Sequence, residues 1–595
     1  MKKPFLVFIS MLFFLLESHA APVRNLKTLV LQPDGTELSL YASGDEFFHR
    51  LHDENGYTII AGDDGYYYYG IQSSDGKKIV PSVYRADQPV PLSAGILPNI
   101  GISTKAYAER MEYFKTYSTI SLKEQAQTRS THKGIINNIV IYISFKDQQT
   151  FLTKRSVYDA RLNSMTNSAG SLKHYYDEVS YGQLDIQSYH FPATDDMGTV
   201  TTGYVDYRNR GFYRAYNATT NPEGYSSSTE TVAREHSLVV NAIDALRSEI
   251  EQTLTAEEID SDNDGYVDNI CFVIQGRSDG WSDLLWAHRW SLYTRECYIH
   301  GKRVMDYVFQ PENQVTTNTL CHEMFHALGA PDLYHYNDDA KYLDPVGNWD
   351  LMNNGWCHMG AYMKWKYSGQ MWVTDMPQIT ASGRFNVVAL AKGPENVCYK
   401  IASTSPDEYY VVEYRKKEGT YEKNIPRSGI LVYLINTKVA EGNMYGPPDE
   451  VYIYRPYGTL ESNGNIDEAA YPTTKGPVIT NHTYPTPFLS NGEDGGLRLS
   501  NIEINGDIAS FDIEIITTDI HEVEKEDVVV YADGYLIIKN ADGVSQIEIC
   551  NMQGIVVKTI TDLSNQIPIT DLSSGIYIMR VNTSLGEYIK KMIIK

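Results

Sequence analysis

One five-residue pattern in this sequence has the residue types and the spacing of a metal-dependent active site. It is His322-Glu323-Met324-Phe325-His326, in which two imidazoles are four residues apart. Residues i and i+4 lie on the same face of a helix, so both imidazoles can bind one zinc ion. Glu323 is not needed as a ligand, because the glutamate of this pattern lies beside the metal-bound water. The pattern predicts hydrolysis by a zinc-activated water, with Glu323 as the general base.

The third ligand must come from outside this pattern. Gly329 follows the motif, and glycine can adopt the left-handed conformation that turns the chain back, so that Asp332 reaches the metal. A Glu some twenty residues downstream is the competing arrangement, but no Glu occurs between Glu323 and Glu395. Asp332 is therefore the preferred third ligand. Four residues remain as alternatives: His335, Asp338, Asp339 and Asp344.

A buried helix with two hydrogen-bonded histidines and no metal is the alternative explanation of the motif. The five-residue pattern arises by chance in about two chains of this length per hundred. With the glycine and the aspartate added, the frequency falls to roughly one in ten thousand. A three-ligand site leaves one position for water, which is typical of a catalytic rather than a structural zinc.

The surrounding residues predict a helix with a separate core face and site face. At about 100° per residue, the apolar positions fill one arc and the motif's histidines and glutamate fill another. The apolar positions are Leu320, Cys321, Met324, Phe325 and Leu328. Residues 316–319 favour a helix N-terminus, and Gly329 followed by Pro331 should end the helix.

Further motifs show a resemblance to a known family. They are SLKHYYDEVSYGQL at 171–184, LWAHRW at 285–290, GNWDLM at 347–352 and HMGAYMKW at 358–365. Over roughly residues 135–516 the chain resembles the immune-inhibitor-A-like metallopeptidases. The resemblance implies a metzincin-type fold, Asp332 as the third ligand, and Met352 as the methionine of the turn beneath the metal. It also implies that residues 21 to about 130 are a pro-segment.

The resemblance leaves two mechanistic questions open. The segment before residue 130 contains no cysteine, so its latency cannot depend on a thiolate bound to zinc. Some metzincins place an oxyanion-donating Tyr two residues after the turn methionine, but this position is Asn354. Three residues are candidates for that donor: Tyr334, Tyr336 and His358.

A second run of carboxylates has the spacing of an EF-hand-like calcium loop. The candidate ligands are Asp260, Asp262, Asp264, Tyr266 and Asp268. The carboxylates take loop positions 1, 3, 5 and 9, and Gly265 at position 6 permits the tight turn. Position 12 is Cys271 rather than Glu, so the bidentate ligand comes from elsewhere or is absent. A solvated acidic turn is the alternative.

The first twenty residues are organised as a signal peptide. Lys2 and Lys3 precede an apolar run from Phe5 to Leu16, and Ser18-His19-Ala20 resembles a cleavage site. No later segment approaches the 18 uninterrupted apolar residues of a membrane span. We therefore expect an exported protein without a transmembrane segment after signal removal.

Composition and charge exclude some partner classes. The 595 residues are 42% hydrophobic and 21% charged, which is typical of a folded protein of several domains. The net charge of -24 argues against nucleic acid and anionic lipid as partners. The six cysteines form no C-x-x-C pair, although export would permit one or two disulfides between residues 271 and 398.

The order of secondary-structure patterns predicts a multidomain chain. An α+β domain at 135–375, with a metzincin-like fold implied by the resemblance, lies between a β-rich pro-segment and linker at 21–130 and C-terminal all-β domains. The first of these is a β-sandwich at 380–516, and the second occupies 525–595. The residues 118–134 look like an exposed linker open to proteolysis.

Periodicity predicts individual elements within these domains. A helix is expected at 232–253 and strands at 139–145 and 270–274. In the β-sandwich, strands are expected at 385–390, 409–414, 429–435 and 509–516. In the last domain they are expected at 528–531, 535–539, 546–551, 576–581 and 588–594.

The last domain resembles a known secretion signal. Residues 567–572, Ser574-Gly575-Ile576-Tyr577-Ile578, Gly586-Glu587 and the closing 590–595 resemble the C-terminal sorting domain of the type IX secretion system. Another accessory β-domain is the alternative. The resemblance implies a secreted or surface-attached protein that contacts the secretion machinery.

These patterns together predict a secreted zinc endopeptidase that hydrolyses extracellular proteins or peptides, with zinc and calcium as cofactors. One alternative is a calcium-dependent surface adhesin on a disabled peptidase scaffold, against which the intact Glu323 argues. The other is a zinc hydrolase that acts on glycans or amides.

Overall fold

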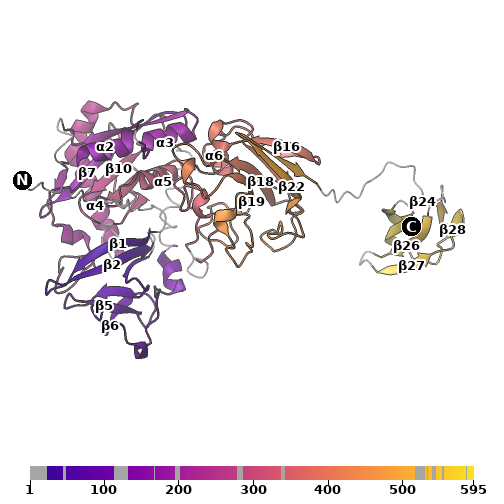
Figure 1. Cartoon of the computed structure of the whole chain (residues 1–595), viewed down its shortest axis with the longest axis horizontal. Helices are drawn as coiled ribbons and strands as arrows, with labels where there is room; N and C mark the ends of the chain where they lie inside the picture. The colour runs from indigo at the N-terminus through magenta and orange to yellow at the C-terminus, as the bar shows by residue number, and fades with distance from the viewer. Residues whose placement is uncertain are drawn as a thin grey trace, which may run out of the picture. The chain divides into compact units, whose positions relative to one another are not determined.

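The computed structural model (Figure 1) describes most of the chain. The described residues are 23–44, 48–110, 112, 132–166, 168–194, 201–277, 286–336, 342–515, 529–532, 534–538, 544–551, 555–583 and 586–594. They fall into two compact units, Met1–Ile515 and Ile516–Lys595. The expected signal peptide and residues 118–131 of the expected linker lie outside the described residues.

The first unit begins with a sheet of six antiparallel strands. Each strand pairs with the next along the chain, because short turns connect strands that are neighbours in sequence. The strands are β1 (Val23–Leu31), β2 (Glu37–Gly44), β3 (His49–His52), β4 (Thr58–Ala61), β5 (Tyr67–Gln72) and β6 (Ile79–Arg85). The predicted β-rich character of this segment is thus confirmed.

A mixed sheet forms the centre of the first unit. Its order is β11-β14-β10-β7-β8, with β9 also paired to β7. All pairs are parallel except that the edge strand β11 runs antiparallel to β14. The strands are β7 (Gly134–Phe145), β8 (Leu184–Phe191), β9 (Tyr204–Asp206), β10 (Ile270–Ile274), β11 (His288–Ser291) and β14 (Asp306–Pro311). A hairpin, β12 (Tyr298–Ile299) and β13 (Lys302–Arg303), lies between β11 and β14 in sequence.

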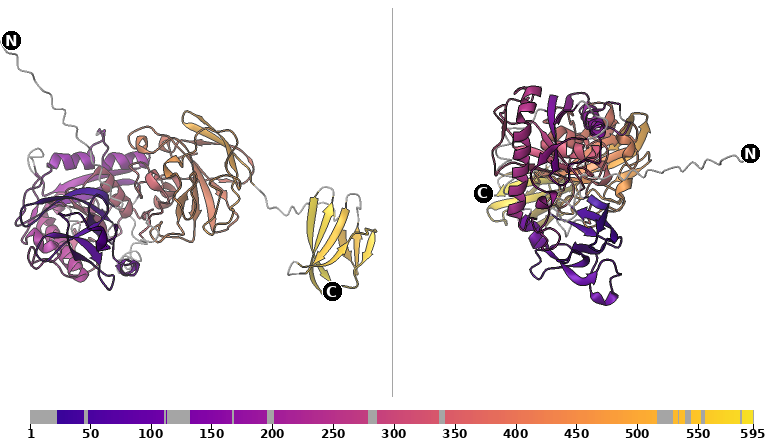
Figure 2. Two further views of the ribbon diagram at one scale, coloured as in Figure 1. Left: turned by 60° about the horizontal axis from the view of Figure 1, so that its bottom comes forward. Right: turned by 90° about the vertical axis from the view of Figure 1, so that its left-hand side faces the viewer.

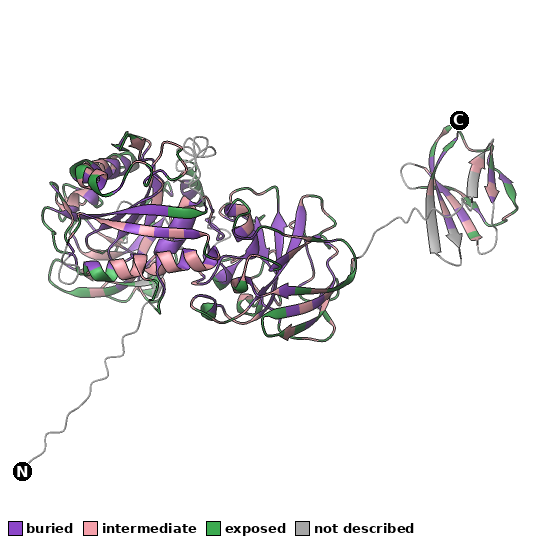
Figure 3. Cartoon of the chain, turned by 90° about the horizontal axis from the view of Figure 1, so that it is seen from above, coloured by how far each residue is buried: buried purple, intermediate pink, exposed green. Residues whose placement is uncertain are grey.

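Helices cover both faces of this sheet. On one face, α4 packs with Ile139 and Ile141 of β7; on the other, α2, α3 and α5 pack with Val140 and Tyr142. β7 and β10 are nearly continuous hydrophobic runs, as expected of strands that are covered on both faces. Figure 3 shows buried strands, in purple, inside the first unit. The helices are α2 (Arg155–Asn163), α3 (Leu172–Val179), α4 (Ser228–Thr253), α5 (Thr317–Ala327) and α6 (Ala361–Tyr367). The predicted helix at 232–253 is confirmed as α4, which starts earlier because Ser227 caps it.

Two further sheets face each other across a shared core and form a β-sandwich. One has the order β15-β17-β18-β19-β20 and the other β16-β23-β22-β21. The strands of the first are β15 (Gln378–Ile379), β17 (Cys398–Ala402), β18 (Glu408–Arg415), β19 (Gly429–Asn436) and β20 (Val451–Ile453). Those of the second are β16 (Gly383–Val388), β21 (Pro477–Ile479), β22 (Leu499–Asn505) and β23 (Ile508–Ile513). All four strands predicted here are present.

Strands β18 and β19 are buried on both faces, and the two faces belong to different cores. In β19, Ile430 and Val432 lie in the sandwich core, whereas Leu431 and Tyr433 lie in the core that contains α5. Successive side chains of a strand point to opposite faces, so one strand can contribute to two cores. The sandwich is therefore packed directly against the part of the chain that carries the histidine motif.

The C-terminal unit is a small antiparallel β structure, yellow in Figure 2. Its sheets have the orders β24-β25-β28 and β27-β26-β29-β30, and side chains from both form one core. The strands are β24 (Val529–Ala532), β25 (Tyr535–Ile538), β26 (Val544–Cys550), β27 (Val556–Ile560), β28 (Gln566–Pro568), β29 (Gly575–Thr583) and β30 (Gly586–Ile594). All five predicted strands are present. β27 and β28 lie where no strand is predicted: most side chains of β27 are exposed, and β28 has only three residues.

The cysteines form no disulfide, although export would permit one or two. All six are free and buried, so no disulfide forms between residues 271 and 398. Each thiol instead fills space in a core, where cysteine behaves as a small apolar residue. In the described part of the chain, no helix has both the length and the apolar character needed to cross a membrane.

Candidate metal centre

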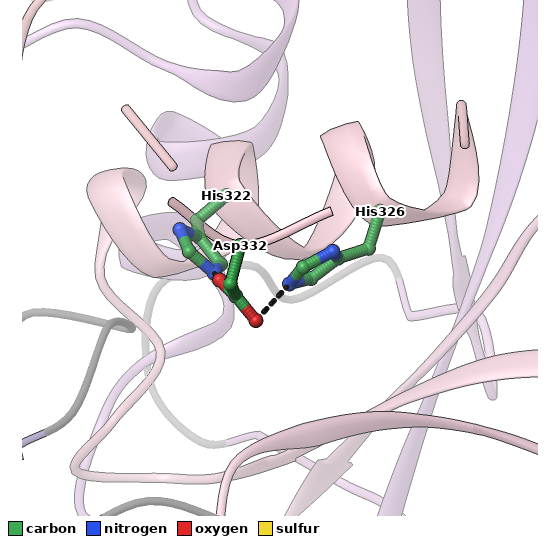
Figure 4. A group of neighbouring side chains, drawn as sticks. All are labelled: His322, His326 and Asp332. Atoms are coloured by element: carbon green, nitrogen blue, oxygen red, sulfur yellow. Dashed lines mark ion pairs between the residues drawn. The ribbon is translucent and has the colours of Figure 1, made fainter. Parts of the chain in front are cut away.

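Helix α5 and the turn after it bring the three predicted zinc ligands together. Thr316 caps the helix by accepting a hydrogen bond from the main-chain N–H of Thr319. Gly329 has a φ of +96°, which glycine adopts without strain, and reverses the chain there. Asp332 thereby lies against His322 and His326, and Figure 4 shows both imidazoles converging on its carboxylate.

Main-chain carbonyls orient both imidazoles. Nδ1 of His322 lies 3.0 Å from the oxygen of Leu351, and Nδ1 of His326 lies 2.8 Å from the oxygen of Ala330. A carbonyl oxygen only accepts hydrogen bonds, so each Nδ1 must carry the proton. In a neutral ring, Nε2 is then left as a lone pair, which is the form that binds a metal.

The three facing atoms suit a cation. Nε2 of His322 is 3.0 Å from Oδ1 of Asp332, and Nε2 of His326 is 3.4 Å from Oδ2. Oδ1 is buried and makes no hydrogen bond, so its approach to His322 lacks hydrogen-bond geometry. With neutral imidazoles, three lone-pair donors face one another within 4.8 Å. Two nitrogens and one oxygen form a donor set that zinc accepts, so the residues fit the ion that the sequence predicts.

Without a metal, the charge of this group is balanced by protons. Burial by itself lowers the pKa of His322, but the adjacent Asp332 carboxylate outweighs it and raises that pKa to about 9. Burial by itself raises the pKa of Asp332, but the two imidazoles hold it well below its usual range. A bound cation would replace these protons, because metal ligands must be deprotonated.

Glu323 lies on the same helix and is buried. Burial raises the pKa of its carboxyl group, and the neighbouring imidazoles of His322 and His326 oppose that rise. Tyr176 of α3 contacts helix α5 next to Glu323, because its hydroxyl donates to the carbonyl oxygen of Cys321 at 2.6 Å. The segment around Ser171–Leu184 thus supports the motif helix directly.

The turn that contains Met352 lies on the other side of the ligands. Met352 is fully buried in the same core as α5, and its carbonyl oxygen accepts from the main-chain N–H of Leu333 at 2.8 Å. Its neighbour Leu351 supplies the oxygen that orients His322. Asp350 holds this turn by accepting from the main-chain N–H groups of Met352 and Gly360.

One buried ion pair near the site has no predicted role. His288 on β11 lies 3.0 Å from Glu235 on α4 through Nε2, and 2.8 Å from the oxygen of Trp286 through Nδ1. Both partners are acceptors, so the ring is an imidazolium when both bonds form. Burial lowers the pKa of His288, but Glu235 outweighs it and raises it above the usual value, and Glu323 contributes in the same direction. The LWAHRW motif contains His288, whereas nothing in the sequence links it to Glu235.

Of the four alternative third ligands, two have side chains bonded to other residues and two lie outside the described residues. Nε2 of His335 is 2.5 Å from Asp449, which occupies it in a separate pair. The carboxylate of Asp344 accepts from the main-chain N–H of Gly347 and from the side chain of Asn353. The remaining two alternatives, Asp338 and Asp339, lie outside the described residues.

The three candidates for an oxyanion donor are also engaged. The hydroxyl of Tyr336 donates to the Asp332 carboxylate, and Tyr334 packs against Tyr336 in an apolar cluster. His358 is buried, and its two ring nitrogens contact Glu178 and Lys364. Tyr336 is therefore the candidate whose hydroxyl lies at the metal-binding residues.

The predicted calcium loop brings together three of its four carboxylates. Oxygens of Asp260, Asp262 and Asp268 lie within 4.8 Å of one another. The Asp264 carboxylate instead accepts from the main-chain N–H of Tyr266 at 2.7 Å, and Tyr266 itself forms a bridge with Arg303.

Main-chain and lysine contacts shape this carboxylate cluster. Gly265 has a φ of +93° and donates its N–H to Asp260. Lys302 also pairs with Asp260 at 2.5 Å. Burial and the neighbouring carboxylates raise the pKa of Asp262 to about 6 and that of Asp268 to about 7. The cluster thus concentrates negative charge that a hard cation would neutralise.

We predict that calcium stabilises the protein through this cluster. A ligand present at 100 times its dissociation constant adds about 2.7 kcal/mol, so calcium should raise the melting temperature by a few degrees. Asp262→Asn should abolish this increase, and Asp268→Asn should abolish it as well. Thermal unfolding with calcium and with a calcium-selective chelator measures both. An equal calcium response in wild type and Asp262→Asn would mean that the loop binds no ion.

Comparison with protein-family models identifies the C-terminal end of the chain. Residues 532–595 match the secretion system C-terminal sorting domain. The match indicates that the protein is exported by type IX secretion to the cell surface or the extracellular space. It also implies that the C-terminal domain interacts with the secretion machinery. None of the curated proteins compared with this chain matches it.

Proposed function

We propose that this exported chain is a zinc-dependent endopeptidase that hydrolyses extracellular proteins or peptides. The observation that carries the proposal is the convergence of His322, His326 and Asp332 within 4.8 Å beside the buried Glu323. The backbone bonds of both imidazoles direct Nε2 of each ring toward the carboxylate, and zinc binding requires this orientation.

Each residue of the group has a defined part in this proposal. His322, His326 and Asp332 would hold zinc, which when bound acidifies a water molecule and polarises the scissile carbonyl. Glu323 would accept a proton from the attacking water and pass it to the departing amine. Tyr336 would orient the Asp332 carboxylate through its hydroxyl.

The N-terminal segment would keep the enzyme latent by covering residues next to the ligands. Its side chains Phe48 and Tyr107 form one apolar cluster with Tyr334 and Tyr336, and Tyr336 bonds Asp332. His49 of the same segment stacks on Trp286 with ring centroids 4.4 Å apart. Both contacts bury aromatic surface, so this form of latency needs no cysteine.

Two other functions are tested with the same protein. A surface adhesin would use the calcium cluster and would not need Glu323, which is present and buried beside the ligands. A zinc hydrolase of glycans or amides would use the same metal site on another substrate. Assays with a protein substrate and with a glycan or amide library together distinguish all three.

The full chain should show metal-dependent proteolysis once the segment before His132 has been cut. Limited proteolysis should raise hydrolysis of a labelled protein substrate, since it releases the N-terminal cover. A zinc chelator should then reduce the rate to background, and added zinc should restore it. Zinc-loaded, processed protein that cleaves no protein would favour the adhesin, and cleavage only of a glycan or amide library would favour the other hydrolase.

A further inference from the structure

The turn that carries Asp332 is held by the sandwich as well as by its own helix. The loop between β19 and β20 lies against it. The main-chain N–H of Asn443 donates to the carbonyl oxygen of Asp332 at 2.9 Å. The main-chain N–H of Tyr336 donates to the carbonyl oxygen of Met444 at 2.9 Å. The two segments thus exchange hydrogen bonds in both directions.

The Asn443 side chain ties this turn to a strand of the sandwich. Asn443 is fully buried, and its amide nitrogen donates to the oxygens of Leu333 and Val451 at 3.0 and 2.7 Å. Its amide oxygen accepts from the main-chain N–H of Val451 at 3.0 Å. Both donors and the acceptor of the amide are therefore used, and the residue after Asp332 is linked to the first residue of β20.

Gly442 shows how closely the two segments approach. A Cβ atom on Gly442 would lie 2.2 Å from the oxygen of Asp332 and 2.9 Å from Cγ of Pro331. Its φ of +64° also favours glycine. Any larger residue must push the loop and the Asp332 turn apart.

A second sandwich residue holds the turn behind His322. Arg415 on β18 is fully buried and donates to the oxygens of Trp349 and His358 at 2.8 and 3.1 Å. Glu413 and Glu422 compensate its charge. The turn fixed in this way includes Leu351, whose oxygen orients the imidazole of His322.

We propose that Asn443 and Gly442 are positioning residues of the metal site, so that the sandwich is part of the catalytic machinery. The inference rests on the proposed function only in that the site must bind zinc. Asn443 sets the main-chain position of Asp332, and that position decides whether the carboxylate meets the two imidazoles. Mutation of a residue that orients a metal ligand typically lowers the metal affinity by 10- to 100-fold.

The alternative is that these contacts only join two layers of a stable protein. The chain offers matched controls for this. Asn436, at the end of β19, is another buried asparagine, and its amide nitrogen donates to Glu408 and Ser490 rather than to the turn that carries Asp332. Gly506 has a φ of +63°, and a Cβ there would meet nothing within 4 Å.

The experiment compares zinc affinity in four full-length variants. Asn443→Asp replaces two donors by a carboxylate facing two carbonyl oxygens and should weaken zinc binding roughly tenfold or more. Asn436→Asp should leave the affinity at the wild-type value, although both variants lose thermal stability. Gly442→Ala should weaken binding in the same way, whereas Gly506→Ala should not. Zinc content is measured by elemental analysis in graded zinc buffers, and metal-free unfolding is measured alongside.

The cobalt-substituted protein gives a second readout. A displaced Asp332 should alter the visible absorption of bound cobalt in Asn443→Asp and Gly442→Ala at full occupancy, which loss of stability alone does not do. If Asn443→Asp does not fold, the zinc affinities and cobalt spectra of Gly442→Ala and Gly506→Ala are compared instead. Wild-type affinity and spectrum in the site variants would overturn the inference alone. A wild-type chain that binds neither zinc nor cobalt would overturn the proposed function as well.

Discussion

Glu323→Gln should separate metal binding from chemistry. The substitution keeps the size of the side chain and leaves His322, His326 and Asp332 in place, so zinc per chain should stay at the wild-type value. Glutamine cannot accept the proton of the attacking water, so peptide hydrolysis should fall by at least about 100-fold. Elemental analysis after gel filtration and a fluorogenic protein substrate, applied to processed enzyme, measure the two quantities.

The same substitution at another buried glutamate controls for burial. Glu235 is a second buried glutamate, but it belongs to the His288 pair. Glu235→Gln should keep zinc and alter the rate less than Glu323→Gln does, because Glu323 alone is the proposed base. Substantial activity in Glu323→Gln would disprove its role as the base, whatever the zinc content.

Asp332→Ala should remove the metal itself. Two imidazoles and water would remain as ligands. Loss of a direct ligand should weaken zinc binding by more than the roughly 100-fold that mutation of a ligand-orienting residue causes. Activity should fall with occupancy and should recover only partly at high zinc. The measurement is zinc per chain in a graded zinc buffer, together with the rate in the same buffer.

Two other residues test whether the third ligand is assigned correctly. Asp344→Ala and His335→Ala remove alternatives whose side chains are bonded elsewhere, to Gly347 and Asn353 and to Asp449. Both variants should retain zinc. Full zinc in Asp332→Ala together with lost zinc in one of these would move the ligand role to that residue.

Local patterns in the sequence are sufficient to predict the motif helix. The spacing of His322 and His326, the caps around Thr316 and the turn at Gly329 all depend on residues within one or two helical turns. Apolar periodicity likewise predicts α4 and the central strands, because helix and strand repeats are local properties of the chain. The convergence of Asp260, Asp262 and Asp268 also follows from a nine-residue loop.

The tertiary structure alone decides which distant residues complete the site. The carbonyl oxygen of Asp332 accepts a hydrogen bond from the main-chain N–H of Asn443, which lies more than a hundred residues later in the chain. His288 pairs with Glu235 only because β11 and α4 meet in the folded unit. Such contacts depend on how whole elements pack, and no periodicity or spacing within one segment encodes them. The sequence determined which residue types are available and which of them one helix and its turn bring together, and the packing of whole elements determined which distant residues lie next to them.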